Sequence, residues 1–345
     1  MDENESISKE KLVLIKRNSW RDDLNFHKPK MDKIVFISIT DPQTAILALE
    51  KGEIDYIYRY WNPSLEALLK LKENPKIDIH TTPDARTYYI KTPYWKEPFN
   101  GTEGILLRKA ISYALDREEF VEGAFFGFAI PATDTIFLSP LLPNVPECCN
   151  LGYDLDLNKA KQLLTEAGWN DTDNDGVLDK NGKPLSDLNL AISTSTDLIW
   201  QKDLALLVQS QLKKIGIEVK IQALEWADYR KIDKTGDYDL KLAYSQPRST
   251  ATSEQLIQFD RKPEINDYSN ANGTLEKSAS NARIAANVDE RSRHICNTCR
   301  ILYDEAGVIP LVHPMEYALM NKKVKGFEFS SMYIYDQLDE CWIED

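Results

Sequence analysis

Apolar positions alternate along some segments of the chain and recur every three or four residues along others. Short alternating segments rich in β-branched and aromatic residues predict strands. These are residues 11–16, 33–39, 54–58, 76–82, 86–92, 188–194, 217–225 and 238–245, with an extended pair in 308–321. Helical spacing predicts helices at residues 44–51, 64–75, 104–115, 116–123, 155–169, 199–216, 226–236 and 286–307, whereas 246–282 is polar and loop-like. Because the two types alternate throughout, the predicted fold class is α/β.

One block, GILLRKAISYALDREEFVEGAFFGFAIPATDTIF at residues 104–137, is apolar and aromatic but carries a charged cluster in its middle. Asp116, Arg117 and Glu118 fall between two helical patterns. Acidic side chains favour the first turn of a helix, because the positive end of the helix dipole lies there. We therefore interpret this cluster as the start of a second short helix and not as a catalytic group.

The length and charge of the chain limit the classes of protein to consider. Its 345 residues are enough for two domains, and 42% hydrophobic with 28% charged residues is the composition of a globular protein. The net charge of −13 argues against nucleic acid as a partner. No apolar run reaches the ~18 residues of a membrane span. The polar start MDENESISKEK lacks the basic and apolar regions of a signal peptide, and taken alone it predicts a cytoplasmic protein.

The five cysteines do not have the even count and regular spacing of a disulfide framework. Adjacent Cys148 and Cys149, together with the Cys296-x-x-Cys299 pair, leave open a shared zinc site or a redox pair, although adjacent cysteines lack the usual spacing of zinc ligands. His294 would add an imidazole, but on a helix it does not share a face with Cys296 and Cys299. We interpret the cysteines as buried or half-exposed thiols.

Five blocks, taken in order, resemble one protein family. They are KPKMDKIVFISITDPQTAILALEKGEIDYIY, LLRKAISYALDREEFVEGAFFGFAIPA, YDLDLNKAKQLLTEAGW with the Asp-Gly turn that follows it, LLVQSQLKKIGIEVKI, and LYDEAGVIPLVHP. In this order and spacing they are similar to the extracytoplasmic solute-binding proteins of peptide and nickel ABC importers, family 5. The stretch PATDTIFLSPLLPNVPECCNLG resembles the nickel-binding branch more closely.

The resemblance implies a two-lobed α/β protein of the class II periplasmic-binding type, which binds solute between lobes that close about a hinge. Residues 1–80 then form the C-terminal part of lobe I and residues 81–90 the first hinge crossing. Residues 91–308 form lobe II, and residues 309–345 the second crossing and the return to lobe I. The implied partners are a small peptide or a nickel chelate, and ABC permease subunits. The implied location is extracytoplasmic, often as a lipoprotein.

Family members begin with a secretory or lipoprotein signal and a long N-terminal part of lobe I, for which this chain shows no counterpart. We therefore expect a chain truncated at its N-terminus, with lobe I incomplete. The alternative is a sensing or protein-interaction domain derived from the same fold. A metal-dependent hydrolase is disfavoured, because the chain carries no G-x-S-x-G or H-E-x-x-H motif.

Seven residues are candidates for ligand contact under this resemblance. Arg248 follows the strand at 238–245, where its guanidinium would pair with a carboxylate of a peptide or a chelator. His313 lies at the expected second crossing, where an imidazole would ligate nickel. Aromatic rings near the first crossing, and one before Arg248, would supply contact area. These rings are Tyr60, Trp61, Tyr89, Trp95 and Tyr244. The structural alternatives are a solvated loop arginine, a hydrogen-bonded hinge histidine and lobe packing.

The segment DTDNDGVLDKNGK at residues 171–183 is the only candidate metal loop in the pattern. Asp171, Asp173, Asp175 and Asp179 occupy ligand positions 1, 3, 5 and 9 of an EF-hand loop. Position 12 is Gly182 and not the bidentate Glu of a complete site. The alternative is an Asp-Gly turn that joins a helix to a strand without metal. The sequence implies no resident cofactor, and calcium here or nickel at the ligand site are the metals that fit its side chains.

Overall fold

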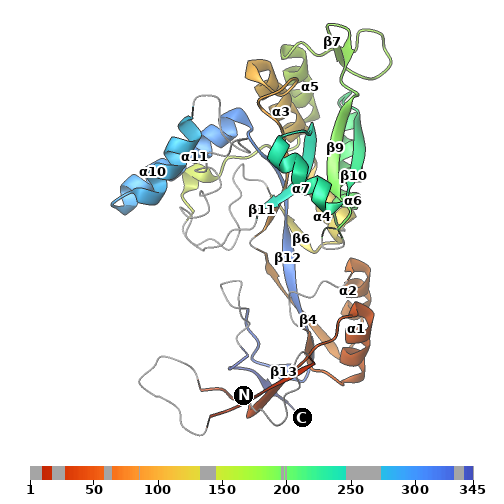
Figure 1. Cartoon of the computed structure of the whole chain (residues 1–345), viewed down its shortest axis with the longest axis vertical. Coiled ribbons are helices and arrows are strands. Elements are labelled where there is room, and N and C mark those ends of the chain that lie inside the picture. The colour runs from red at the N-terminus through yellow and green to blue at the C-terminus, as the bar shows by residue number, and fades with distance from the viewer. Residues whose placement is uncertain are drawn as a thin grey trace. The chain divides into compact units, whose positions relative to one another are not determined.

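The computed structural model describes residues 10–17, 28–57, 64–84, 86–132, 145–195, 198, 200–245, 273–329 and 338–344 (Figure 1). The chain divides into two compact units. The first comprises Met1–Thr82 and Glu316–Asp345, and the second comprises Pro83–Met315. The expected assignment of lobes and hinge crossings to these parts of the chain stays a prediction.

The first unit contains two small β-ribbons and two capped helices. Its elements are β1 (Lys11–Ile15), β2 (Lys33–Ile37), α1 (Pro42–Lys51), β3 (Tyr56–Ile57), α2 (Leu65–Lys72), most of β4 (Ile77–Pro83), the end of β12 (Ile309–Asn321), β13 (Val324–Lys325) and β14 (Trp342–Ile343). Helix α1 begins where the Asp41 side chain accepts from the Thr44 amide, and it ends at Gly52 in the left-handed region at φ 73°. Both signals are local, which is why the sequence predicted this helix.

The second unit is built on a mixed sheet in the strand order β10-β9-β11-β5-β12. Strands β9 (Leu188–Ser193), β10 (Val219–Leu224) and β11 (Leu240–Ser245) pair in parallel, while β5 (Thr87–Lys91) pairs antiparallel to β11 and β12. The other elements are α3 (Gly101–Ala114), α4 (Arg117–Phe125), β6 (Ala129–Pro131), η1 (Glu147–Cys149), α5 (Leu157–Glu166), β7 (Asp179–Lys180), β8 (Lys183–Pro184), α6 (Trp200–Lys213), α7 (Trp226–Thr235), α10 (Thr274–Ile284) and α11 (Val288–Glu305). The predicted α/β class is confirmed.

The charged cluster in the block at residues 104–137 begins helix α4, as the sequence predicted. The Asp116 side chain accepts from the amides of Glu118 and Glu119, and so caps the helix. Buried Gln211 of α6 adds a second restraint, because its Oε1 accepts from the Asp116 amide at 2.8 Å. The cluster is therefore a structural joint between α4 and α6.

Two arginines of the same block are buried and bind backbone carbonyls. Arg108 donates from Nη2 to the Glu305 carbonyl at 2.6 Å, which ties α3 to the end of α11. Arg117 donates to the carbonyls of Ala132 and Tyr153, both at 2.9 Å. Burial lowers the pKa of each guanidinium to about 10, so both stay charged at neutral pH. The basic residues of the block thus join segments distant in sequence.

Two parts of the chain differ from the sequence prediction. Residues 246–282 were expected to be loop-like, but α10 begins at Thr274. Its apolar residues Leu275, Ala279 and Ala282 pack in one core cluster with α11, and this narrow stripe of small residues gave little signal among polar neighbours. The expected extended pair at 308–321 is one strand, β12, with pairing partners along its length.

The interpretation of all five cysteines as thiols was wrong. Disulfides join Cys148 to Cys296 and Cys149 to Cys299, and the buried Cys341 takes part in neither. The pairing is possible because α11 presents positions 296 and 299 on one face, while the short turn of η1 places the two adjacent sulfurs on the facing side. A stable zinc site or a cluster with His294 does not form in this oxidised state.

Candidate functional site

The candidate site is built on β5 and β11, which bring Tyr88 opposite Tyr244 in register. The buried ring of Tyr88 stacks on Trp200 of α6 with centroids 3.6 Å apart and an angle of 4° between the planes. Half-buried Tyr244 meets Tyr88 edge-on at 6.4 Å and 80°. Burial raises the pKa of Tyr88 well above its ordinary value, so this phenol stays neutral. Tyr244 is thus the partly accessible ring of an otherwise packed aromatic cluster.

Tyr89, the other predicted ligand residue on β5, lies on the opposite face of the strand. It pairs with Ala243 in register and belongs to a core cluster with Leu275, Ile295 and Cys299. Successive strand residues point to opposite faces, so the strand that presents Tyr88 to α6 presents Tyr89 to α10 and α11. Lobe packing, the alternative left open by the sequence, accounts for Tyr89, and ligand contact by it stays a prediction.

His313 lies on β12 and is buried beside β5. Its Nδ1 is 3.0 Å from Thr87 Oγ1 and 3.4 Å from the Arg86 carbonyl oxygen. Burial lowers its pKa to about 4, although the Arg86 carbonyl and the charge of Asp84 act in the opposite direction. The imidazole is therefore neutral at physiological pH. A proton on Nδ1 donated to the Arg86 carbonyl would leave Nε2 as the acceptor nitrogen, the form that binds metals.

Trp95, another predicted contact residue, makes its ring contacts outside this cluster. Trp95 lies beyond Lys91, the C-terminal residue of β5. Its ring makes edge-on contacts with Tyr94 and Tyr238, at 5.1 and 6.0 Å between centroids. Tyr60, Trp61 and Arg248 lie outside the described residues. Their roles in ligand contact stay predictions.

The aspartate loop between α5 and β7 brings together three of its four predicted ligands. Single ligand atoms of Asp171, Asp173 and Asp175 lie within 4.8 Å of one another, and all three side chains are exposed. Asp179 is not part of this group. Its Oδ2 accepts hydrogen bonds from the Thr172 amide at 2.9 Å and from the Thr172 hydroxyl at 2.6 Å. These bonds lower the pKa of Asp179. Calcium binding by this loop stays a prediction.

The loop is also stabilised by its own backbone. Asp171 accepts from the Gly176 amide at 3.1 Å, and Asp175 accepts from the Val177 amide at 2.8 Å. These short-range bonds are typical of Asp-Gly turns and need no metal. The Asp-Gly turn is thus a sufficient explanation of the geometry.

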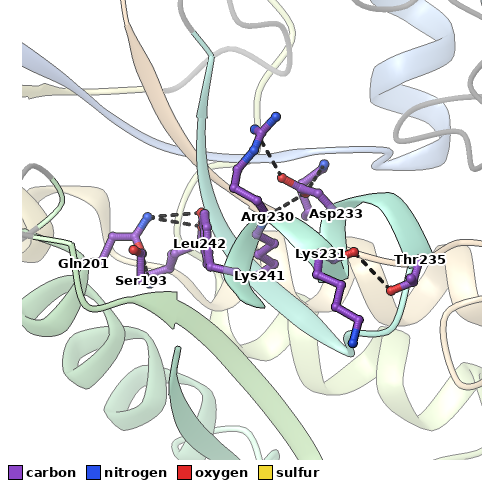
Figure 2. A network of polar contacts seen from close by, with 10 residues as sticks. Ser193, Gln201, Arg230, Lys231, Asp233, Thr235, Lys241 and Leu242 are labelled. Atoms are coloured by element: carbon purple, nitrogen blue, oxygen red, sulfur yellow. Dashed lines mark hydrogen bonds and ion pairs between the residues drawn. The ribbon is translucent and has the colours of Figure 1, made fainter. Parts of the chain in front are cut away.

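A buried ionic network under the sheet was not expected from the sequence (Figure 2). Lys241 of β11 is fully buried, and its Nζ lies 2.6 Å from Asp233 Oδ1 of α7 and 3.8 Å from the centre of the Tyr229 ring. Lys91 of β5, the cross-strand partner of Lys241, donates to the same carboxylate oxygen at 3.0 Å. Burial alone would raise the pKa of Asp233, but the two lysines lower it by more, so the carboxylate stays ionised.

The same network continues to α6 and β9. Gln201 donates from Nε2 to the Leu242 carbonyl at 3.3 Å, and its Oε1 accepts from the Ser193 amide at 2.6 Å. Polar side chains thus bind the strand backbone beside the Tyr88–Trp200 stack. A signal was present in the sequence, since a lysine inside the apolar run LKLAYS requires a buried partner. The network fixes α7 and α6 against the strands that carry Tyr88 and Tyr244.

The Tyr88–Trp200 stack, the half-buried Tyr244 ring and the polar network beside them form a rigid aromatic and hydrogen-bonding surface. Among the residues that the structure describes, the exposed trio Asp171, Asp173 and Asp175 is the one group of three metal-ligating side chains that could hold an ion. In the same part of the chain, no helix combines the length and apolar character needed to cross a membrane.

Comparison with known proteins gives one family and a set of partial relatives. A family model described as “Bacterial extracellular solute-binding proteins, family 5 Middle” matches residues 4–267. The oligopeptide-binding protein AppA of Bacillus subtilis is 34% identical over 207 residues, which cover 60% of this chain and 36% of AppA. The nickel-binding periplasmic protein of Escherichia coli is 31% identical over 198 residues, or 56% of this chain and 36% of the relative.

Solved structures share the fold over nearly the whole chain. NikA from Brucella suis in complex with Fe(III)-EDTA superposes with a TM-score of 0.78 at 23% identity, covering 97% of this chain and 66% of NikA. AppA from Bacillus subtilis in complex with a nonapeptide gives a TM-score of 0.64 at 24% identity, covering 99% of this chain and 65% of AppA. The chain thus spans about two thirds of these structures, and these similarities establish the class II periplasmic-binding type of fold.

Proposed function

Because the chain belongs to family 5 of the bacterial extracellular solute-binding proteins, we propose that it is a solute-binding component of an ABC importer for peptides or nickel chelates. The family consists of extracytoplasmic binding proteins and not of enzymes. The observation that carries the proposal is the family match over residues 4–267, which include the strands of Tyr88 and Tyr244. Permease subunits would be its partners in transport.

The geometry around Tyr244 supports a contact with solute. Its ring is half-buried next to the packed Tyr88–Trp200 stack, so it offers contact area without a large loss of side-chain freedom on binding. The phenol adds a hydrogen-bonding group at the end of β11. Arg248, three residues beyond the end of that strand, would add a cation for a carboxylate.

The ligand class that fits these side chains is a peptide or a carboxylate-bearing chelate. His313 would offer a metal only Nε2, and among the described residues it belongs to no group of three metal-ligating side chains, which disfavours direct capture of a bare nickel ion at this position. The names of the relatives support both classes, since one is an oligopeptide-binding protein and the other a nickel-binding protein. An extracytoplasmic location is further supported by the two disulfides, which persist in oxidising compartments.

The proposal is tested by offering the purified chain a mixture of short peptides, nickel(II) alone and nickel(II) with a polycarboxylate chelator. Native mass spectrometry reads the retained mass, and tryptophan fluorescence reports through the Trp200 stack. We expect retention of a peptide or of the chelate, and no retention of nickel alone. If the chain retains neither a peptide nor the chelate, the proposal is wrong.

A substitution at Tyr244 tests the place of the contact. Tyr244→Ala should weaken solute binding about 5- to 30-fold, because loss of a central aromatic contact costs about 1–2 kcal/mol. Tyr244→Phe should lose less, since the ring remains. The control is Trp226→Ala on α7, a residue that is 45% exposed and contacts Tyr229 and Arg230. Equal loss in Tyr244→Ala and Trp226→Ala would place the contact elsewhere.

A further inference from the structure

Four cysteine sulfurs meet at one place between η1 and α11. Cys148 and Cys149 are adjacent in the chain, yet their Sγ atoms are 4.0 Å apart on the same side of the turn. Each is joined to one cysteine of α11, with Cα atoms 5.5 Å apart for Cys148–Cys296 and 5.2 Å apart for Cys149–Cys299. The sequence objection to a shared site, that adjacent cysteines lack the usual spacing of zinc ligands, therefore does not prevent their sulfurs from lying close together in this fold.

The spacing of these sulfurs suits a tetrahedral metal. Zinc–thiolate bonds of about 2.3 Å place the sulfurs of a tetrahedron about 3.8 Å apart. Cys148 and Cys149 already have this separation within 0.2–0.3 Å by that rough measure. After reduction each bridged pair has to open by about 2 Å, a movement that side-chain rotation can supply without moving η1 away from α11.

Two cations of α11 favour thiolates here, while the exposed Glu147 that precedes Cys148 in η1 acts in the opposite direction. Arg293 and Arg300 stand three residues before and four residues after Cys296 on α11, so the three positions form one stripe along the helix. Cations near a thiol favour its ionised form, and they also offset the double negative charge of a metal bound by four thiolates. Cys149 and Cys299 are buried, whereas Cys148 is exposed and Cys296 half-buried, so the cluster has one side open to an incoming ion.

We propose that Cys148, Cys149, Cys296 and Cys299, when both disulfides are reduced, form a four-thiolate site for a single soft divalent metal ion, zinc(II) or cadmium(II). A dithiol reductant gives each disulfide two electrons and two protons and is oxidised to its own disulfide. A phosphine gives two electrons, and one water molecule supplies the two protons and the oxygen of the phosphine oxide that forms. The metal then replaces up to four thiol protons, which pass to solvent. The site is distinct from Tyr244 and does not depend on the proposed transport function.

The test compares the oxidised and the phosphine-reduced chain in a titration with cadmium(II) alone. In the reduced chain we expect a sulfur-to-cadmium charge-transfer band that saturates at one ion per chain. Native mass spectrometry should give the mass of one cadmium less the displaced protons. The oxidised chain should give no such band. No band in the reduced chain, or saturation at two ions, overturns the proposal.

Variants separate the four-sulfur site from simple thiol binding. Cys149→Ser/Cys299→Ser should weaken cadmium binding on the order of 100-fold or more, because two of four metal–sulfur bonds are lost. Cys341→Ser removes the one cysteine outside the two disulfides and should leave binding unchanged. Circular dichroism follows folding of the reduced chain. If reduction unfolds it, cadmium must restore the helical signal, and a chain that stays unfolded with cadmium present contradicts the proposal.

Discussion

The charge state of a buried histidine affects the stability of the folded chain, because a buried imidazolium loses its hydration. His313 contacts Thr87 Oγ1 and the Arg86 carbonyl in a buried position on β12. These neighbours give the neutral ring a partner at Nδ1, but they do not recover the hydration that an imidazolium would lose there. Folding therefore lowers the pKa of His313, and acid should lower the free energy of unfolding.

The pH dependence of stability follows from that shift. The pKa of His313 is about 4 in the folded chain against 6.5 as its ordinary value, so between these pH values the unfolded chain binds more protons. The folded chain keeps its full stability at this residue above about pH 6.5, where His313 is neutral in both states. As the pH falls to 4, up to about 3 kcal/mol of the free energy of unfolding is lost. His313→Asn retains a side-chain hydrogen bond without the titration. Denaturant unfolding at several pH values should show the difference between wild type and variant shrinking in acid, and a constant difference would contradict this assignment.

Two contacts attach helix α7 to strand β11: the buried Tyr229 hydroxyl donates to the Leu242 carbonyl, and the Asp233 carboxylate lies between two lysines. Asp233→Asn leaves Lys91 and Lys241 facing each other across β5 and β11 without that charge, and should lower the free energy of unfolding by about 3 kcal/mol or more. Arg230→Ala is the matched control, because Arg230 approaches the same carboxylate at 3.8 Å but is largely exposed, and it should cost under about 1 kcal/mol. Urea unfolding measures both. Similar losses in the two variants would show that the buried network does not hold α7.

Elements with local signals were predictable, and contacts between distant segments were not. The cap at Asp116 and the stop at Gly52 are read from neighbouring residues, and both helices form as predicted. Helix α10 was missed because its buried stripe of small residues has meaning only against α11. In the candidate site, alternation placed Tyr244 on a strand. It did not reveal that Tyr88, and not Tyr89, would share its cluster, because cross-strand register depends on partners far along the chain.

At the scale of the whole molecule, the two disulfides join parts of the second unit that are far apart in sequence. Their sequence separations are 148 and 150 residues, so each closes almost the same large loop. On the chain-entropy estimate, closing a loop of this size stabilises the folded state by about 5 kcal/mol. Once the first bridge has formed, the second bridge closes only a small loop of the few residues that lie between the two bridges. The same estimate gives a stabilisation of about 2 kcal/mol for this small loop.

The stabilising effects of the two bridges should therefore be strongly non-additive. Cys148→Ser/Cys296→Ser removes the more exposed bridge and should cost about 2 kcal/mol, because Cys149–Cys299 still closes the large loop. The quadruple serine variant should lose about 5–7 kcal/mol, which exceeds the sum of the two separate losses. Chemical denaturation without reductant measures these two variants and Cys149→Ser/Cys299→Ser, whose loss should also be about 2 kcal/mol. The reduced wild type without metal should resemble the quadruple variant. Losses that simply add would show that each bridge acts through its local packing, and that neither serves as the closure of the loop between η1 and α11.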